Sequence, residues 1–267
     1  MVDHLLSEFD LTKDEVLKIV KTNKKDIVYI SGSIVEGYSN QGSDLDVYVI
    51  ASEPYELIDK SIPCKKLSYG KEYTFLGHQI LISALVIERE EFDRLINHVE
   101  EKIISNQLIE LNNKIVEFYH RVSKGIPLKN DSCFYEIKDR LITESFSKGL
   151  SLQRLVYSEN RHDDAAGALK SGDEYTAYLS AKISLEKSID GLLCAEGETN
   201  PSDKWLFRRL FSKYELEEDW VTEFVDCYMG NKDYSNIKDR VIEMLRLANR
   251  IRVMGYQRYN DLSKISQ

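Results

Sequence analysis

Cysteine and histidine are scarce in this sequence, and neither residue type is clustered. The four cysteines, Cys64, Cys133, Cys194 and Cys227, lie far apart, and the five histidines are equally scattered. Structural disulfides and zinc sites need paired or closely spaced ligands, so the pattern predicts reduced thiols and no zinc centre. No apolar run approaches the roughly 20 residues of a membrane span, and residues 1–4 lack the basic, apolar start of a signal peptide. We therefore expect a soluble, cytoplasmic protein.

Positive charge is also in short supply. With 36 basic and 45 acidic residues the formal net charge is −9, which disfavours a broad electrostatic footprint for nucleic acid. A cationic small molecule would suit this balance better. The chain has 267 residues, of which 42% are hydrophobic, so it is long enough for two domains that each bury a core.

The most informative stretch begins with the apolar run Ile27–Ile30. A loop rich in glycine and serine follows, and Asp44 and Asp46 then lead into a second apolar run, which predicts strand, turn and strand. Residues i and i+2 of a strand share a face, so the two carboxylates project together while Leu45 and Val47 face the core. Adjacent carboxylates repel each other unless a cation compensates. Mg²⁺ or Mn²⁺ is the hard cation that oxygen ligands suit.

The loop between these strands has the composition of a phosphate-binding turn. Gly32 and Gly37 let the backbone approach a ligand closely, and the turn at Gly32 and Ser33 can present N–H groups and a hydroxyl to phosphate oxygens. A nucleoside triphosphate with its Mg²⁺ needs both a phosphate cradle and carboxylates that hold the metal. The alternative interpretation is a plain glycine-serine hairpin followed by surface aspartates.

Gly32-Ser33, Gly37 and the run Ser43-Asp44-Leu45-Asp46 resemble the signature of the DNA polymerase β-like nucleotidyltransferase superfamily over about the first 90 residues. The resemblance implies an α+β fold, with a mixed sheet and flanking helices followed by an all-α helical bundle. It implies Mg²⁺ or Mn²⁺ on Asp44 and Asp46, and an NTP, expected to be ATP, whose β- and γ-phosphates contact Gly32 and Ser33. Ser43 would orient the turn.

The remaining periodicity predicts the order of elements. Thr12 and Glu15 form a capping-box pattern for a helix that ends near Lys21. A short helix is expected over 54–59, with strands over 73–76 and 79–87. From Glu88 the pattern is helical, and helices are expected over 134–157, 163–170 and 174–195, from 201, and over 218–228 and 237–259. The Gly125 to Ser132 region combines a glycine, a proline and a polar run, which predicts domains 1–125 and 132–267.

The second half carries a further resemblance. Asp164–Asp173, with the following helix and Pro201–Trp205, looks like the substrate-binding helical domain of antibiotic, kanamycin-type nucleotidyltransferases. This resemblance implies transfer of NMP to a hydroxyl of an aminoglycoside-like molecule, with release of pyrophosphate. Close packing of helices through small residues is the simpler interpretation of the alanines in this segment.

Position 83 departs from the superfamily pattern. Relatives that use two metals place a third acidic residue on the strand beside the Asp-x-Asp strand, and the matching residue here is Ser83, with Glu88 and Glu90 too late in the chain. Three explanations stay open. The second metal is absent, a carboxylate comes from elsewhere, or the domain binds nucleotide without turning it over.

The acceptor hydroxyl needs a proton acceptor, and the resemblance places it in the helical domain. Glu144 is the candidate, although an exposed ion-pair row with Arg140 and Lys148 is the rival interpretation. The other acidic candidates are Glu136, Asp139 and Glu159.

Lys204 begins a helix, where the dipole does not favour a cation. We expect it either to bind phosphate or pyrophosphate or to lie over the ring of Trp205.

Two other functions remain alternatives to small-molecule modification. One is adenylylation of a protein or peptide side chain, as in antitoxin-type enzymes, and the other is a catalytically degenerate nucleotide-binding regulator. A ribonuclease is disfavoured, since the sequence lacks the Arg-x(4–6)-His pair of related helical domains. A homodimer is left open.

Overall fold

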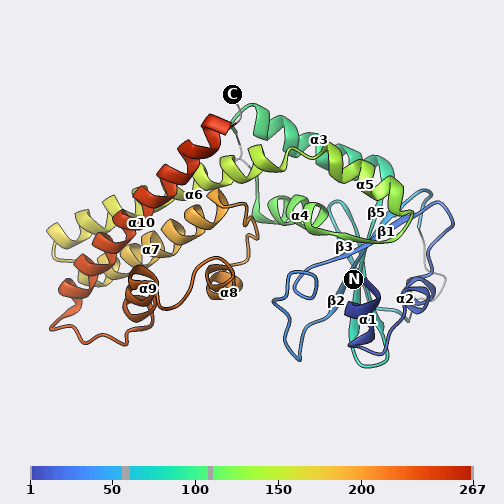
Figure 1. Ribbon diagram of the computed structural model, residues 1–267, viewed down its shortest axis with the longest axis horizontal. Coiled ribbons are helices and arrows are strands. Elements are labelled where there is room, and N and C mark those ends of the chain that lie inside the picture. Colours follow the sequence, from blue (N-terminus) through green and yellow to red (C-terminus); the bar gives the residue numbers. More distant parts are fainter. Residues whose placement is uncertain (1, 56–60, 108–110, 266–267) are drawn as a thin grey trace. The chain divides into compact units, whose positions relative to one another are not determined.

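The computed structural model describes residues 2–55, 61–107 and 111–265 of the chain (Figure 1). It divides into two compact units, the first made of residues 1–102 and 111–142 and the second of 103–110 and 143–267. A mixed sheet with helices forms the first unit and helices form the second, so the predicted α+β class is confirmed. The helix expected over 54–59 lies mostly outside the described residues, and the domain limits at 125 and 132 stay a prediction.

The first unit contains the sheet. Its strands are β1 (Ile27–Ser31), β2 (Leu45–Ala51), β3 (Cys64–Leu67), β4 (Gly70–Leu76), β5 (Leu81–Glu88) and β6 (Ile126–Lys129). Its helices are α1 (Val2–Ser7), α2 (Lys13–Val20), α3 (Arg89–Ile104), α4 (Asn113–Lys124) and α5 (Asp131–Arg140). The predicted capping box is present at α2: Thr12 Oγ1 accepts from the backbone N–H of Glu15, and the Glu15 carboxylate accepts from the N–H of Thr12. The Thr12 hydroxyl and the Thr12 backbone N–H both donate to the Glu15 carboxylate and lower the pKa of Glu15.

The sheet has the strand order β3-β4-β5-β2-β1-β6. β2 and β5 are parallel, and every other neighbouring pair is antiparallel. Parallel strands need a long connection, and the chain between β2 and β5 supplies it. This connection contains β3 and β4, an antiparallel pair that extends the sheet on the side of β5 away from β2. The central strand β2 therefore has β1 on one side and β5 on the other. Each polar residue of β2 lies between a residue of β1 and a residue of β5.

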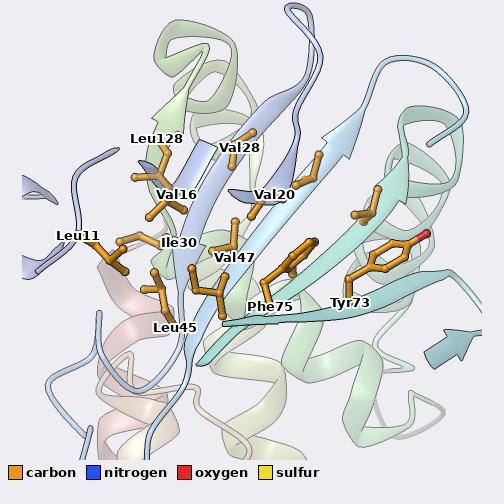
Figure 2. Close-up of a cluster of buried hydrophobic side chains, with 14 of the residues drawn as sticks. Leu11, Val16, Val20, Val28, Ile30, Leu45, Val47, Tyr73, Phe75 and Leu128 are labelled. Carbon is orange, nitrogen blue, oxygen red and sulfur yellow. The ribbon is translucent and has the colours of Figure 1, made fainter. Parts of the chain in front are cut away.

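One face of the sheet carries the hydrophobic core of the first unit. Figure 2 shows side chains from β1, β2 and β4 converging with those of α2 and of Leu128 on β6. Val28 and Ile30 of β1 and Leu45 and Val47 of β2 are fully or almost fully buried there, as the period-2 pattern predicts. Because these residues occupy one face, the residues between them, including Asp46, lie on the other.

The opposite face is aromatic and is covered by α4 and α5. Tyr29 stacks on Tyr48 with ring centroids 4.9 Å apart and on Phe134 of α5 at 4.5 Å. Residues 126–129, expected as a break between domains, instead form β6 beside β1. Gly125 is needed before this strand, since a Cβ there would lie 2.6 Å from the Tyr29 ring and 2.8 Å from Phe134.

The second unit is built on long helices. Its elements are α6 (Thr143–Lys170), α7 (Glu174–Ala195), the 3₁₀ helix η2 (Asp203–Trp205), α8 (Leu206–Phe211), α9 (Asp219–Met229) and α10 (Ile237–Ile265). α6 packs along α7 closely enough for hydroxyls to reach the facing backbone: Ser151 Oγ donates to the Gly191 carbonyl at 2.8 Å and Ser158 Oγ to that of Ser184 at 2.7 Å. Within the described chain, no helix is both long and apolar enough to cross a membrane.

The helices expected over 134–157 and 163–170 were placed wrongly. α5 ends at Arg140, because Leu141 takes an extended conformation, and α6 then runs unbroken from Thr143 to Lys170. No break follows Tyr157: Ser158 lies within α6, and its Oγ donates to the Ser184 carbonyl of α7.

Candidate functional site

The two aspartates of the central motif lie at the start of β2. Asp44 is exposed and immediately precedes the strand, while Asp46 is the second residue of the strand and is partly buried. Asp46 pairs with Ser31 of β1 and with Ser83 of β5, so a serine flanks it on each side. The register therefore places the Asp46 carboxylate in the middle of the sheet face that α4 covers.

The charge of Asp46 is unfavourable in this environment. Burial raises the pKa of its carboxyl to about 7, Arg121 opposes the shift, and the nearby carboxylates of Asp44, Glu117 and Glu72 add to it. A carboxyl with such a pKa is half protonated near neutral pH. A cation close to it would stabilise its ionised form more than it would stabilise an exposed aspartate. The acids around Asp46 thus form a donor set suited to a divalent ion.

The loop before Asp46 is a tight turn built around Gly32. Gly32 has φ +91°, and its carbonyl accepts from the N–H of Glu36 at 3.0 Å, while the carbonyl of Ser33 accepts from Tyr38 at 2.7 Å. A Cβ at Gly32 would lie 2.0 Å from Oδ2 of Asp46. The turn therefore holds its backbone directly against the carboxylate, which only glycine permits.

Helix α4 contributes a buried arginine to the same place. Arg121 Nη1 donates to Glu36 Oε1 at 3.2 Å and lies 4.0 Å from Asp46 Oδ2, and Nη2 donates to Glu117 Oε1 at 3.1 Å. The other oxygen of Glu36 contacts Nε2 of the fully buried His120 at 3.0 Å. Burial alone would lower the pKa of Arg121, but the surrounding acidic groups raise it, so the guanidinium stays charged. Arg121 thereby ties the glycine turn and β2 to α4.

A cavity of about 200 Å³ opens beside Asp46 on this face of the sheet. Its lining comes from β2, β3, β4, β5 and α4 and includes Asp46, Lys65, Glu72, Ser83, Lys114, Glu117 and Arg121. Glu72 of β4 reaches the neighbouring strand β5, where Ser83 Oγ donates to its Oε1 at 3.1 Å. The cavity is therefore polar, with both charge signs on its walls.

The structure places the other predicted residues as follows. Ser43 lies in the turn before Asp44, where its Oγ accepts from the N–H of Asn40 at 2.9 Å. Gly37 also has a positive φ, +73°, but has open space around it.

Two predicted residues belong to the second unit. Glu144 is exposed in the first turn of α6, and Lys148, its expected partner, lies over the ring of Tyr259 at 5.3 Å. Lys204 lies over Trp205 at 4.8 Å, the simpler of its two interpretations. The roles of both residues stay predictions.

Sequence reasoning missed Arg121 and Glu72. A signal for Arg121 exists, since Lys114, Glu117, Phe118 and Arg121 follow helical spacing and all line the cavity. Glu72 lay outside the strand expected to begin at residue 73, whereas β4 begins at Gly70 and alternation then puts Glu72 on the cavity face.

Fold and site together define a mixed α+β domain in which a glycine turn presses on a carboxylate pair at the start of a central strand. Residues 13–122 match the family model described as a nucleotidyltransferase domain, a region that contains the turn, both aspartates and Arg121. The match supports nucleotidyl transfer as the general reaction class of this region, and such domains generally use an NTP with a divalent metal.

The chain also resembles a solved structure, the nucleotidyltransferase-like protein from Exiguobacterium sibiricum 255-15. The two chains are 12% identical, and the likeness covers 92% of this chain and 77% of that one with a TM-score of 0.47. The comparison with curated proteins gave no match.

Proposed function

We propose that the first unit binds an NTP with a divalent cation and transfers its NMP group to a hydroxyl of a small acceptor. The observation that carries the proposal is the contact between the turn and the strand. The backbone of Gly32 lies so close to Asp46 that no side chain would fit between them, and burial raises the pKa of the Asp46 carboxyl to about 7. Burying such a group costs free energy, and a bound cation offsets that cost.

The residues present fit a divalent cation. Asp44 and Asp46 would hold it, and when bound it would neutralise charge on the triphosphate and on the leaving pyrophosphate. Backbone N–H groups at Gly32 and the hydroxyl of Ser33 would bind the β- and γ-phosphates. Burial raises the pKa of Asp46 to about 7, and Arg121 opposes that rise, so part of the Asp46 carboxyl is ionised at neutral pH.

In the reaction, the acceptor oxygen attacks the α-phosphorus in line and pyrophosphate leaves. One acidic side chain takes the hydroxyl proton, and Glu144 is our candidate. We propose ATP as the nucleotide, Mg²⁺ as the metal and an aminoglycoside-like molecule as the acceptor, with the protein acting in the cytoplasm. The formal net charge of −9 supports a cationic acceptor. Lys204 is proposed to contact phosphate or pyrophosphate.

The test is an incubation with Mg²⁺, each labelled NTP and a panel of aminoglycosides, with pyrophosphate release as the readout. Wild type is expected to release pyrophosphate with one NTP, and Asp44→Asn together with Asp46→Asn is expected to abolish release. Release that persists in the double variant would remove the proposed site. A panel of peptides in place of aminoglycosides tests the adenylylation of protein side chains.

A second candidate, a nucleotide-binding regulator, is favoured by one observation. Ser83 pairs directly with Asp46, where the superfamily resemblance calls for an acid. Tight NTP binding with no pyrophosphate release for any acceptor would select the regulator over the enzyme.

A further inference from the structure

Strand β4 brings a third carboxylate to the face that carries Asp46. β5 lies between β2 and β4, and its Ser83 pairs with Asp46 on one side and Thr74 on the other. Thr74 and Glu72 are two residues apart on β4 and share a face. Ser83 Oγ then donates to Glu72 Oε1 at 3.1 Å. Ser83 thus lies beside Asp46 in the strand pairing and holds the Glu72 carboxylate through its hydroxyl.

The second oxygen of Glu72 is only weakly engaged. Lys65 Nζ lies 3.7 Å from Oε2, and the lysine side chain is 71% exposed against 34% for that of Glu72. An exposed pair at this distance contributes little free energy, so Lys65 can leave at small cost. Glu72 and Asp46 line the same cavity, which has room for an ion and part of a ligand.

Two buried donors near Asp46 are also unsatisfied. Among the described residues, Ser31 Oγ and Arg121 Nε have no hydrogen-bond partner, although Ser31 is fully buried and Arg121 is 9% exposed. Ser31 pairs directly with Asp46. Each buried unpaired donor costs about 1–3 kcal/mol, and such groups call for an explanation such as a ligand. Arg121 also pairs with Glu36, Glu117 and Asp46, so Ser31 is the observation that is independent of the acidic side chains, and it lies directly beside Asp46.

We propose that Glu72, held by Ser83, completes a divalent-cation site with Asp44 and Asp46. The inference deepens the proposed function and rests on it. Ser83 has no charge and does not bind the cation in this arrangement. It is a positioning residue: its hydroxyl holds the carboxylate of Glu72, from the next strand, at the place where the superfamily pattern has an acidic residue at position 83.

Binding of Mn²⁺, counted by electron paramagnetic resonance with and without α,β-methylene-ATP, tests the proposal on the full chain. Glu72→Gln is expected to weaken Mn²⁺ binding by about tenfold or more, and Ser83→Ala by about three- to tenfold. Ser83→Asp in the Glu72→Gln background is expected to restore binding, since it puts an acid beside Asp46. Glu88→Gln, an exposed acid at the end of β5, is the matched control and should bind as wild type does.

Lys65→Met distinguishes two roles of Glu72: a ligand of the cation, or an acid that only pairs with Lys65. Removing this cation should strengthen Mn²⁺ binding about threefold more than Lys114→Met, the other lysine of the cavity wall, does if Glu72 is a ligand. The two lysine variants should have equal effects if Glu72 only anchors β3. Lys65→Met and Ser83→Ala keep all three carboxylates, so they decide the question even if Glu72→Gln does not fold.

The two failures are distinguishable. If wild type binds Mn²⁺ and releases pyrophosphate, Glu72→Gln and Ser83→Ala bind as wild type does, and Lys65→Met gains no more than Lys114→Met, then Glu72 is not a ligand and the proposed function stands. If wild type binds no Mn²⁺ with or without the nucleotide analogue, both proposals fall.

Discussion

At the scale of single residues, the protonation of Asp46 controls the proposed site. Burial, with neighbouring acids, raises its pKa to about 7 against the opposing effect of Arg121. A divalent cation binds the ionised form, so binding must displace a proton over the range where the carboxyl is protonated. The affinity for a metal is therefore expected to depend on pH in a range where ordinary aspartates are already fully ionised.

The first prediction follows directly. The Mn²⁺ dissociation constant is expected to fall about tenfold per pH unit up to about pH 7 and to level off above about pH 8. Calorimetric titrations at pH 6, 7 and 8, in buffers of different ionisation enthalpy, measure both the constant and the protons released. A dissociation constant that does not change between pH 6 and 8 would contradict the raised pKa.

The same shift predicts an unusual effect on stability without metal. The folded protein holds the Asp46 proton up to about pH 7, whereas the unfolded chain releases it near pH 4. The folded state therefore binds more protons across that window, and stability falls as the pH rises through it. Asp46→Asn should raise the free energy of unfolding by about 1–3 kcal/mol at pH 8 and by much less at pH 5. Urea denaturation in chelator measures this, with the exposed Asp44→Asn as the control expected to change little.

Gly32 offers a third prediction at this scale. Gly32 and Gly37 both have a positive φ, so alanine at either position adds backbone strain of about 1 kcal/mol. Only at Gly32 would the new methyl group also overlap Asp46 and Arg121. Gly32→Ala is expected to lower pyrophosphate release more than a hundredfold and to destabilise the protein more than Gly37→Ala does. Equal effects of the two variants in thermal melts and in the activity assay would show that the contact with Asp46 is unimportant.

At the scale of elements, the sequence predicted the parts of the fold that local patterns encode. The capping box at Thr12, the strand, turn and strand around Asp46, and the burial of Leu45 and Val47 are all observed. They depend on residues two to four positions apart, so periodicity and capping rules are sufficient.

Elements that depend on distant partners could not be predicted in the same way. Strand β6 forms because β1 offers it a free edge, although its own sequence contains Pro127 and reads as a break. The cavity depends on register: Glu72 and Ser83 are eleven residues apart and meet only because β4 and β5 pair antiparallel with Thr74 opposite Ser83. Arg121 is 75 residues from Asp46, and only the position of α4 over the sheet brings them together.

A buried ion network joins the helices of the second unit. Arg209 is 1% exposed and donates to Asp190 Oδ1 at 2.8 Å, while Arg154 lies 3.2 Å from Oδ2. Burial would raise the pKa of Asp190, but Arg209, Arg154 and Lys187 outweigh it and hold the pKa below its usual value. The network therefore stabilises the packing of α6, α7 and α8 only while both charge signs are present.

The fourth prediction tests this network. Arg209→Met leaves the buried Asp190 short of its closest cation and is expected to cost about 3–5 kcal/mol of unfolding free energy. Arg208→Met, the exposed neighbour that lies over Trp205, is expected to cost less than about 1 kcal/mol. Urea titrations of the two variants at pH 7 provide the comparison, and a small loss in Arg209→Met would mean that Asp190 is satisfied by other groups.

At the scale of the whole molecule, the two units have separate hydrophobic cores. The core of the first lies between the sheet and helices α1 and α2, and that of the second lies among α6 to α10. Every described residue that lines the cavity beside Asp46 belongs to the first unit. A nucleotide with its metal should therefore stabilise the first unit directly, whereas the acceptor, if it binds the helical unit, should stabilise the second.

Hydrogen exchange can separate the two effects. A ligand at 100 times its dissociation constant stabilises the state that binds it by about 2.7 kcal/mol. With Mg²⁺ and α,β-methylene-ATP, we expect slower exchange in β1, β2 and α4, with little change in α7 and α10. Asp46→Asn should remove the protection at the same nucleotide concentration, since it removes the charge that holds the cation. Protection confined to the helical unit would place the nucleotide there and contradict the assignment of the site to the glycine turn and the two aspartates.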